Sequence, residues 1–308
     1  MKSEDFLSAR DLAPSELLAL FEKASAMKRD RKQYFGSRTA MTMAMLFEKP
    51  SLRTRVTFDV GITQLGGAGI FLGPSDIDLG KRESVYDVAK NLERMVDIIM
   101  IRTFAHSVCT DMAEFAGIPV INGLTDREHP CQTLADYFTM WEIQGDLNGK
   151  KLAYVGDGNN MAHSLLLMGA RLGVSVSIAT PEGYEPDEEV VETAREDGEA
   201  SGATMLVTNN ATEAVAEADA VYTDVWASMG QEDEAEERKK RFLPYQVNES
   251  LISRAKPDAI FLHCLPAHRG EEVTDAVIDS EQSVVFQEAE NRLHVQKALV
   301  HELTLDYS

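Results

Sequence analysis

Arginine side chains beside the expected start of a helix are the first feature of this sequence that could do chemistry. The segment Phe47–Arg55 follows an apolar run, and Ser51 within it is suited to cap a helix. A capped start leaves backbone N–H groups of the first turn free to bind an anion. Arg53, Arg55 and the hydroxyl of Thr54 would add donors that suit a doubly charged phosphate. The alternative is a surface helix start with exposed arginines.

A further arginine, Arg102, ends the apolar run Ile98–Ile101. In open α/β sheets, ligands collect at the carboxyl ends of the strands. We therefore expect Arg102 to face a ligand. The alternative is an arginine that points from the strand end into water.

The tetrapeptide His129–Gln132 could polarise a carbonyl group. Pro130 fits the first position of a helix, which would hold His129 and Gln132 at the mouth of that helix. An imidazole there can hydrogen-bond a carbonyl oxygen whose negative charge grows during acyl transfer. A glutamine carboxamide can orient a neighbouring –NH2 group. The alternative is a capping histidine with a first-turn glutamine, and we expect Cys131 to be a packing residue.

A glycine-rich turn, Val155–Asn160, leads from a strand into a helix in the second half of the chain. It resembles a dinucleotide-binding turn, but Met161 stands where that motif has its third glycine. No acidic residue ends a second strand about 20 residues further on, where Ala179–Pro181 stands. A turn that presents Asn160 to a small polar ligand fits the residues better.

Two more segments follow expected strands. Asp224 and Ser228 are an acid and a hydroxyl that could hold an ammonium group, although a solvated acidic loop is the alternative. Cys264 stands at the end of the run Ala259–Leu262, where reactive groups gather, although most buried cysteines only pack. His263 could equally be a core histidine. No spacing of metal ligands and no Ser-His-Asp order is present.

Short apolar runs alternate with longer amphipathic stretches, and this pattern indicates βα units around a parallel sheet. With 308 residues the chain exceeds one usual core. The sequence predicts an α/β fold of two domains, each a mostly parallel sheet flanked by helices. The expected strands are Met41–Phe47, Ile98–Ile101, Pro119–Ile121, Leu152–Val155, Val174–Ala179, Ala220–Tyr222, Ala259–Leu262 and Val284–Phe286.

A turn-rich stretch at Gly145–Gly149 predicts the domain boundary. The expected domains are residues 1–145 and residues 146–289. A terminal helix, roughly Arg292–Leu303, is expected to pack with residues 290–308 back onto the first domain.

Composition restricts the partners and the compartment. The chain has 30 Lys and Arg against 51 Asp and Glu, a net charge of −21, which disfavours nucleic acid and anionic membranes as partners. No apolar run approaches the roughly 18 residues that a membrane helix needs. Three cysteines and an acidic amino terminus indicate a cytoplasmic protein with reduced thiols. The acidic excess also suggests a halophilic protein, whose self-repulsion is screened in a salt-rich cytoplasm.

Together and in this order, the motifs resemble those of the carbamoyltransferase family, from about Phe6 to the terminal helix. Ser51–Arg55 resembles the family's Ser-Thr-Arg-Thr-Arg, with Leu52 in place of a threonine, and His129–Gln132 resembles His-Pro-x-Gln. Asp224–Gly230, with its Ser-Met-Gly core, and His263–Pro266 are similar to the ornithine branch rather than the aspartate branch.

The resemblance implies transfer of a carbamoyl group from carbamoyl phosphate to the δ-amine of L-ornithine, giving L-citrulline and phosphate. It implies residues for the phosphate (Ser51, the Leu52 backbone, Arg53, Thr54, Arg102), for the carbamoyl oxygen (His129, Arg102, Arg292) and for the carbamoyl amide (Gln132 and the carbonyls of Cys264 and Leu265), with Pro130 and Cys131 completing the substrate segment. For ornithine it implies Asn160, Asp224, Ser228 and the Met229 backbone, and for proton removal Asp224 with Cys264.

The resemblance further implies a trimer-based homo-oligomer and no cofactor or metal. One position departs from the family, because Asp78 stands where a glutamine is usual in a loop that reaches a neighbouring subunit. Three alternatives stay open: a carbamoyltransferase for putrescine, acetylornithine or aspartate, an NAD-dependent dehydrogenase, and a non-catalytic relative that binds amino acids. The direction of the reaction in arginine metabolism is also open.

Overall fold

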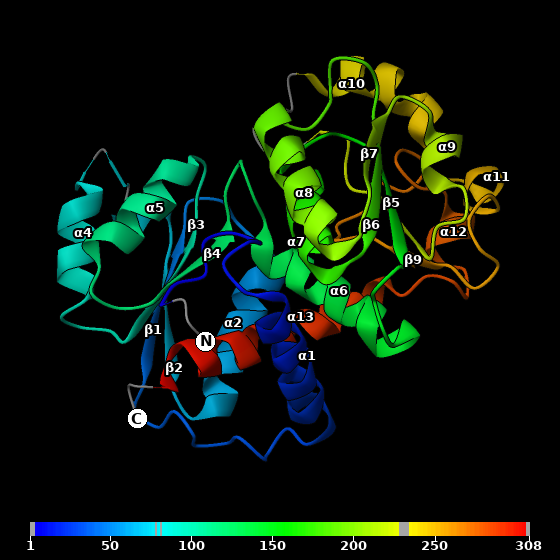
Figure 1. The fold of residues 1–308 in the computed structure, drawn as a ribbon. Coiled ribbons are helices and arrows are strands. Elements are labelled where there is room, and N and C mark those ends of the chain that lie inside the picture. Colours follow the sequence, from blue (N-terminus) through cyan, green and yellow to red (C-terminus); the bar gives the residue numbers. More distant parts are fainter. Residues whose placement is uncertain (1–3, 78, 81, 228–233, 306–308) are drawn as a thin grey trace. The chain divides into compact units, whose positions relative to one another are not determined.

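The computed structural model describes residues 4–77, 79–80, 82–227 and 234–305 (Figure 1). The chain divides into two compact units, one formed by Met1–Phe138 with Glu290–Ser308 and the other by Thr139–Ala289. Each unit contains one sheet, and every strand pair described in the two sheets is parallel. The predicted fold class is therefore confirmed.

The sheet of the first unit has the order β2-β1-β3-β4. Its inner strands are apolar on both faces, as expected where helices cover a parallel sheet on both sides. The edge strand β2 was not predicted, because it contains glycine and three of its five residues are exposed, so it lacks a continuous apolar run. The strands are β1 (Thr42–Phe47), β2 (Ala68–Leu72), β3 (Ile98–Arg102) and β4 (Val120–Leu124).

Helices cover this sheet. One face packs against α4 and α5, where Val88, Ala89, Cys109 and Met112 join the side chains of Ala44 and other strand residues in one apolar cluster (Figure 1). The helices of the unit are α1 (Pro14–Arg29), α2 (Leu52–Leu65), α3 (Pro74–Ile77), α4 (Val85–Leu92), α5 (His106–Phe115), α6 (Pro130–Gln144), which continues into the second unit, and α13 (Val285–Leu303), which begins there.

The sheet of the second unit has the order β7-β6-β5-β8-β9. Ala153 and Val155 of β5, Val221 of β8 and Phe261 of the edge strand β9 pack into one core with α9, α11 and α12. The elements are β5 (Lys151–Val155), α7 (Asn160–Leu172), β6 (Ser175–Ala179), α8 (Glu188–Ser201), β7 (Met205–Thr208), α9 (Ala211–Val215), β8 (Ala220–Tyr222), α10 (Ala235–Phe242), the 3-10 turn η2 (Leu243–Tyr245), α11 (Glu249–Ile252), β9 (Ile260–Leu262) and α12 (Asp275–Ile278).

One predicted strand is wrong. Val284–Phe286 is the entry to helix α13, which begins at Val285 rather than near Arg292. The stretch makes a single bridge, Ser283 to Phe261, and Val284 N donates to Phe261 O before the helix starts. This short run with β-branched residues therefore contacts the sheet through a single bridge beside it and does not form a strand.

The two compact units divide between Phe138 and Thr139, inside α6. The last turn of α6 is bonded to the second unit, because Gln144 Nε2 donates to Asp219 O at 2.8 Å and Glu142 accepts from Gln287 at 2.8 Å. A continuous helix carries no sequence signal at such a division. At the other end of the chain, Arg38 Nε donates to Thr304 Oγ1 at 2.9 Å, which ties α13 to the first unit.

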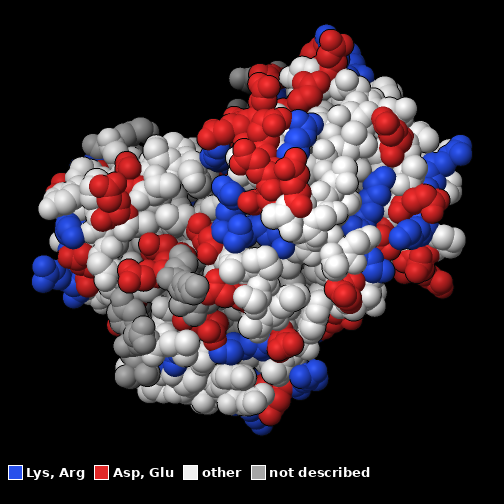
Figure 2. All heavy atoms as spheres, in the orientation of Figure 1, with Lys and Arg blue, Asp and Glu red and all other residues white. Residues whose placement is uncertain are grey.

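Acidic side chains gather over α8, whose exposed face carries Glu188, Glu189, Glu192, Glu196 and Glu199 (Figure 2). Among the described residues, no helix combines the length and the apolar character that a membrane crossing requires.

In each sheet the order in which the strands were added changes direction at one point, called the switch point. In the first sheet β1 is followed by β2 on one side and β3 lies on its other side, and in the second sheet β6 and β8 flank β5 in the same way. Ligands of open α/β sheets bind beyond the carboxyl ends of the strands at such switch points. The loops after β1 and β3, and those after β5 and β8, are therefore where a site is expected.

Candidate active site

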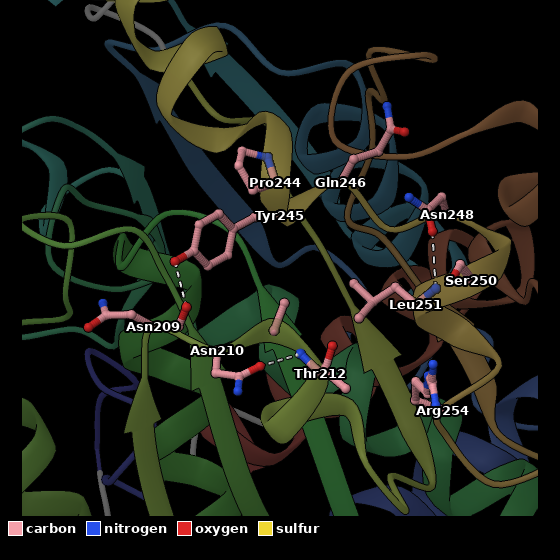
Figure 3. Close-up of a pocket in the computed structure, with 11 residues that line it drawn as sticks. Asn209, Asn210, Thr212, Pro244, Tyr245, Gln246, Asn248, Ser250, Leu251 and Arg254 are labelled. Carbon is pink, nitrogen blue, oxygen red and sulfur yellow. Dashed lines mark hydrogen bonds between the residues drawn. The ribbon is translucent and has the colours of Figure 1, made fainter.

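A polar cavity of about 600 Å³ lies in the second unit, but no residue of the predicted site lines it (Figure 3). Its wall includes Asn210, Tyr245, Asn248 and Arg254. These side chains are largely engaged within the wall, since Tyr245 donates to Asn209 O at 2.7 Å and Asn248 and Asn210 cap short helices. The predicted chemistry lies elsewhere, at the switch points.

The start of α2 is built as an anion site. Ser51 is its N-cap, with an extended backbone, and its hydroxyl accepts from Thr54 N at 3.2 Å. Leu52 is largely exposed, and because its side chain has no hydrogen-bonding group, only its backbone can bind an anion in the first turn. The N-terminal end of a helix dipole and its first-turn N–H groups favour negative charge here. Arg292 of α13 adds positive charge, because its guanidinium donates to Thr54 Oγ1 at 2.9 Å.

Three arginines act on one buried imidazole. Burial lowers the pKa of His129 well below 6.5, and the positive charges of Arg292, Arg102 and Arg53 lower it further. Arg102 is the last residue of β3, and its side chain is buried. The alternative of an arginine that points from the strand end into water is therefore wrong. The imidazole is therefore neutral at neutral pH. A neutral N–H donor beside guanidinium groups is suited to a carbonyl oxygen that becomes negative.

Helix α6, which follows His129, supports the expectation that Cys131 is a packing residue and adds Asp136 to the site. Cys131 is fully buried, its thiol donates to Asn122 O at 3.2 Å, and burial raises its pKa to about 12, so it packs rather than reacts. Pro130 is the first residue of α6 as predicted. Gln132 Nε2 donates to the buried carboxylate of Asp136 at 2.8 Å. Because a carboxylate only accepts, this bond fixes which end of the Gln132 amide is the oxygen.

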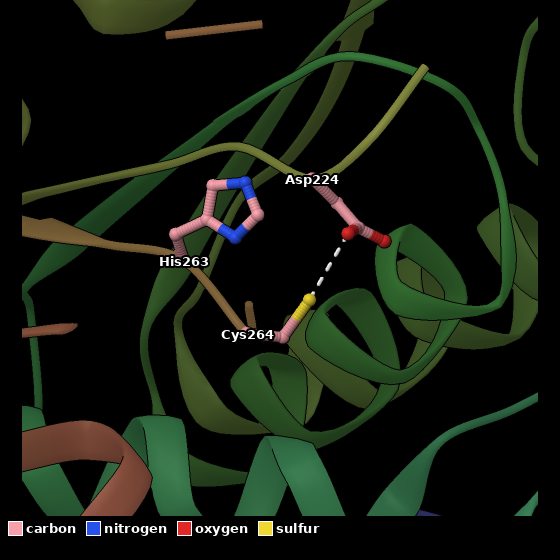
Figure 4. A group of neighbouring side chains, drawn as sticks. All are labelled: Asp224, His263 and Cys264. Carbon is pink, nitrogen blue, oxygen red and sulfur yellow. Dashed lines mark hydrogen bonds between the residues drawn. The ribbon is translucent and has the colours of Figure 1, made fainter. Parts of the chain in front are cut away.

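In the second unit, Asp224 and Cys264 meet beyond the ends of β8 and β9. The Cys264 thiol donates to Asp224 Oδ1 at 3.0 Å (Figure 4). Asn159 Nδ2 donates to the other oxygen, Oδ2, at 3.2 Å. The carboxylate is held from both sides, next to the only cysteine of the three that is not buried. An acid placed in this way can hold an ammonium group or receive a proton.

His263 is a core residue. Leu265 N donates to its Nδ1 at 2.9 Å, so the ring proton lies on Nε2, which faces Glu272 Oε1 at 3.1 Å. Its backbone N donates to Glu288 Oε2 at 2.9 Å. The ring therefore shapes the turn that presents the carbonyls of Cys264 and Leu265. Asp224, His263 and Cys264 lie within metal-binding range of one another, but the ring nitrogens are engaged inside the fold.

The glycine-rich turn has a structural reason for its second glycine. A Cβ at Gly158 would lie 2.3 Å from Pro186 N, so this glycine permits a close approach of the segment around Pro186. Asn160 is the half-buried first residue of α7. Nearby, Arg238 donates to Asp157 at 3.0 Å and to Trp226 O at 3.0 Å.

The predicted residues thus fall into two sets. The first unit brings together the arginine and histidine set, namely Ser51, Leu52, Arg53, Thr54, Arg102, His129, Pro130, Cys131, Gln132 and Arg292. The second unit carries Asn160, Asp224, Cys264 and Leu265. Ser228, Met229 and Asp78 lie outside the described residues.

Sequence reasoning missed Asn159 and Asp136. Asn159 caps α7, accepting from Met161 N at 2.9 Å, and a capping signal before an apolar helix could have identified it. Asp136 stands four residues after Gln132, the spacing at which helical side chains meet.

Comparisons with known proteins identify the class to which this arrangement of two parallel α/β units belongs. Residues 4–142 match the carbamoyl-P binding domain of aspartate/ornithine carbamoyltransferases, and residues 148–303 match their Asp/Orn binding domain. The chain belongs to the aspartate/ornithine carbamoyltransferase family.

Individual relatives are ornithine carbamoyltransferases. The chain is 54% identical over 304 residues to that of Anoxybacillus flavithermus, covering 97% of this chain and 96% of the relative. It is 52% identical over 302 residues to that of Pyrococcus abyssi, covering 97% and 95%. The solved structure of the enzyme from Pyrococcus furiosus matches with a TM-score of 0.93 and 51% identity, covering 96% of this chain and 95% of that chain.

Proposed function

We propose that the chain catalyses the reversible transfer of the carbamoyl group from carbamoyl phosphate to the δ-amine of L-ornithine, giving L-citrulline and phosphate. The observation that carries this proposal is the convergence of Arg53, Arg102 and Arg292 on His129 beside the capped start of α2. That set matches a small phosphorylated carbonyl compound. Carbamoyl phosphate is thus assigned to the first unit, and ornithine to the second unit.

The first unit would bind both ends of carbamoyl phosphate. The first-turn N–H groups of α2, Ser51, Thr54 and the guanidinium groups of Arg53 and Arg102 bind the phosphate oxygens. Arg102, Arg292 and the neutral His129 donate to the carbamoyl oxygen. Gln132, held by Asp136, accepts from the carbamoyl –NH2 group.

The second unit would bind the amino acid. Asp224, with Asn160 and with Ser228 and the Met229 backbone, holds the α-amino and α-carboxylate groups of ornithine. The carbonyls of Cys264 and Leu265 hold the carbamoyl amide. The hydrogen bond between Cys264 and Asp224 supports a joint role for the pair in taking the proton of the incoming amine.

The proposed reaction has two bond changes. The neutral δ-amine attacks the carbamoyl carbon, and the C=O electron pair moves to the oxygen, where the positive donors stabilise the oxyanion. The pair returns as the C–O bond to phosphate breaks. The amine loses one proton, to Asp224 with Cys264 or to the departing phosphate. The balance is one C–N bond formed and one C–O bond broken.

Transfer of label from isotope-labelled carbamoyl phosphate to each amine of a panel tests the substrate. Ornithine should be used far better than putrescine, acetylornithine or aspartate, and equal rates with another amine would refute the ornithine assignment. Arg102→Ala should lower kcat about 100- to 1,000-fold, as removal of an oxyanion donor does elsewhere. A variant with near-normal turnover would remove Arg102 from the mechanism.

The chain is also proposed to act as a trimer-based homo-oligomer. The edge strand β2 and the neighbouring helix α2 expose apolar side chains, namely Ile70 and Phe71 with Val56 and Val60. An uncovered apolar edge strand invites pairing with another chain. Sedimentation equilibrium should give a multiple of three chains, and a monomer at micromolar concentration would contradict this proposal.

A cytoplasmic location and halophilic behaviour complete the proposal. No disulfide joins the three cysteines, which fits a reducing compartment. The net charge of −21 and the acidic face of α8 support a requirement for salt. Activity and melting temperature should rise as KCl is added, and full activity with an unchanged melting temperature in low salt would refute the halophilic proposal.

A further inference from the structure

A buried glutamine, Gln296, lies one helical turn after Arg292 on α13 and is fully shielded from solvent. With its carboxamide oxygen toward Arg292, it accepts from the guanidinium NH2 at 3.1 Å and from Nε at 3.2 Å. Its –NH2 group then donates to Thr57 Oγ1 at 2.6 Å. In this orientation each polar atom of the amide faces a partner of the opposite kind.

Thr57 connects this contact to the anion site. Its hydroxyl donates to the backbone carbonyl of Arg53 at 2.7 Å, so its oxygen can accept from Gln296. Arg292 itself donates to Thr54 Oγ1 at 2.9 Å. A hydrogen-bonded path therefore runs from the first turn of α2 through Thr57 and Gln296 to Arg292, and the side chains of Thr57, Gln296 and Arg292 are buried.

We infer that Gln296, supported by Thr57, is a positioning residue that fixes the guanidinium plane of Arg292 against the first turn of α2. A guanidinium has five donors in a rigid fork, and Gln296 engages the edge formed by Nε and one NH2 group. The orientation of the rest of the fork is thereby set for the carbamoyl oxygen. This inference rests on the proposed function of Arg292.

The neutrality of the acceptor has its own consequence. A carboxylate at position 296 would hold the fork equally well but would offset the positive charge that Arg292 exerts on its surroundings. That charge is the largest electrostatic contribution, after burial, to the low pKa of His129. Geometry and charge can therefore be separated by two substitutions of similar size, Gln296→Met and Gln296→Glu.

The experiment measures kcat and KM for both substrates in wild type, Gln296→Met, Gln296→Glu and Thr57→Val, with an NMR titration of His129. Gln296→Met should lower kcat/KM for carbamoyl phosphate about 10- to 100-fold, the range for a lost hydrogen bond to a charged group, and leave the KM for ornithine within about twofold. Thr57→Val should give a smaller loss of the same kind. Gln296→Glu should raise the pKa of His129. The control is Gln287→Met, because Gln287 lies on the same helix but is bonded to Glu142. It should change neither kcat/KM for carbamoyl phosphate nor the pKa of His129.

Several results would overturn the inference. One is a Gln296→Met variant that keeps kcat/KM within about twofold of wild type. Another is a set of variants whose melting temperature falls while the kinetics and the His129 titration stay unchanged, which would make the role only structural. If Gln296→Met fails to fold, Thr57→Val and Gln296→Glu decide by the same criteria. Failure of the proposed function is distinguishable, because wild type itself would then form no citrulline while the His129 titration still reports on Gln296.

Discussion

A buried lysine on α13 should make the protein less stable than it could be. Lys297 is only 2% exposed, and its Nζ donates to Gln64 Oε1 at 2.9 Å. Burial, with a smaller effect of Arg31, lowers its pKa from 10.5 to about 8. No step of the proposed reaction uses this lysine. Replacing it by methionine, which has a similar length and no charge, should therefore stabilise the fold.

The magnitude follows from the pKa. One pKa unit corresponds to about 1.4 kcal/mol, so a fall from 10.5 to about 8 sets an upper limit of about 3 kcal/mol for the gain. The unfolded chain binds this proton more tightly than the folded chain, so stability increases with pH while the lysine is losing its proton. The gain from Lys297→Met should be full at pH 8 and below, shrink between pH 8 and pH 10.5, and vanish above that range.

Thermal denaturation of wild type, Lys297→Met and the exposed-lysine control Lys32→Met, at several pH values from 7 to 10, measures this gain. Each kcal/mol corresponds to roughly 2–4 °C in Tm for chains of about 150–250 residues, and to about 1.5 °C for a chain of 308 residues. Lys297→Met should melt several degrees higher at pH 7, and Lys32→Met should match wild type. A Lys297→Met variant that melts lower than wild type, or a gain that does not change with pH, would refute the reasoning.

Three further substitutions probe the site. Asp136→Asn lets the Gln132 amide turn over, so kcat/KM for carbamoyl phosphate should fall about tenfold, and an unchanged value in the citrulline assay would contradict the orientation given to Gln132. Glu272→Ala leaves the Nε2–H of buried His263 without its acceptor, which should lower stability by about 1–3 kcal/mol in urea unfolding and raise the KM for ornithine. Arg292→Gln should raise the pKa of His129 toward 6.5 in an NMR titration, because one of the charges that lower it is lost; a constant pKa would contradict the contribution of Arg292.

The sequence was sufficient for the fold class, because the inner strands β1, β3 and β5 are apolar on both faces and read as continuous runs. It was not sufficient for β2, whose exposed side chains and Gly69 break the run. It was misleading at Val284–Phe286, where β-branched and aromatic residues open a helix. The amino-acid composition of a short segment does not show whether the segment forms a full strand of a sheet or only a single bridge to it.

For the site, motifs predicted the residue types and topology decided their partners. The strand-end position of Arg102 was enough to predict a role there. The contact of Asn159 with Asp224 and that of Gln296 with Thr57 join segments far apart in the chain. Such contacts depend on which strands and helices are neighbours, and a single sequence does not contain that information.

The anion-binding unit is discontinuous in the chain, since it needs Glu290–Ser308 as well as Met1–Phe138. During synthesis the ribosome releases Thr139–Ala289, the whole of the second unit, before the last helix is available. The second unit can therefore fold first, while the earlier-made part of the first unit waits for α13 to deliver Arg292 and Gln296. A nascent chain stalled near its end would carry a finished amino-acid-binding unit beside an anion site that is still incomplete.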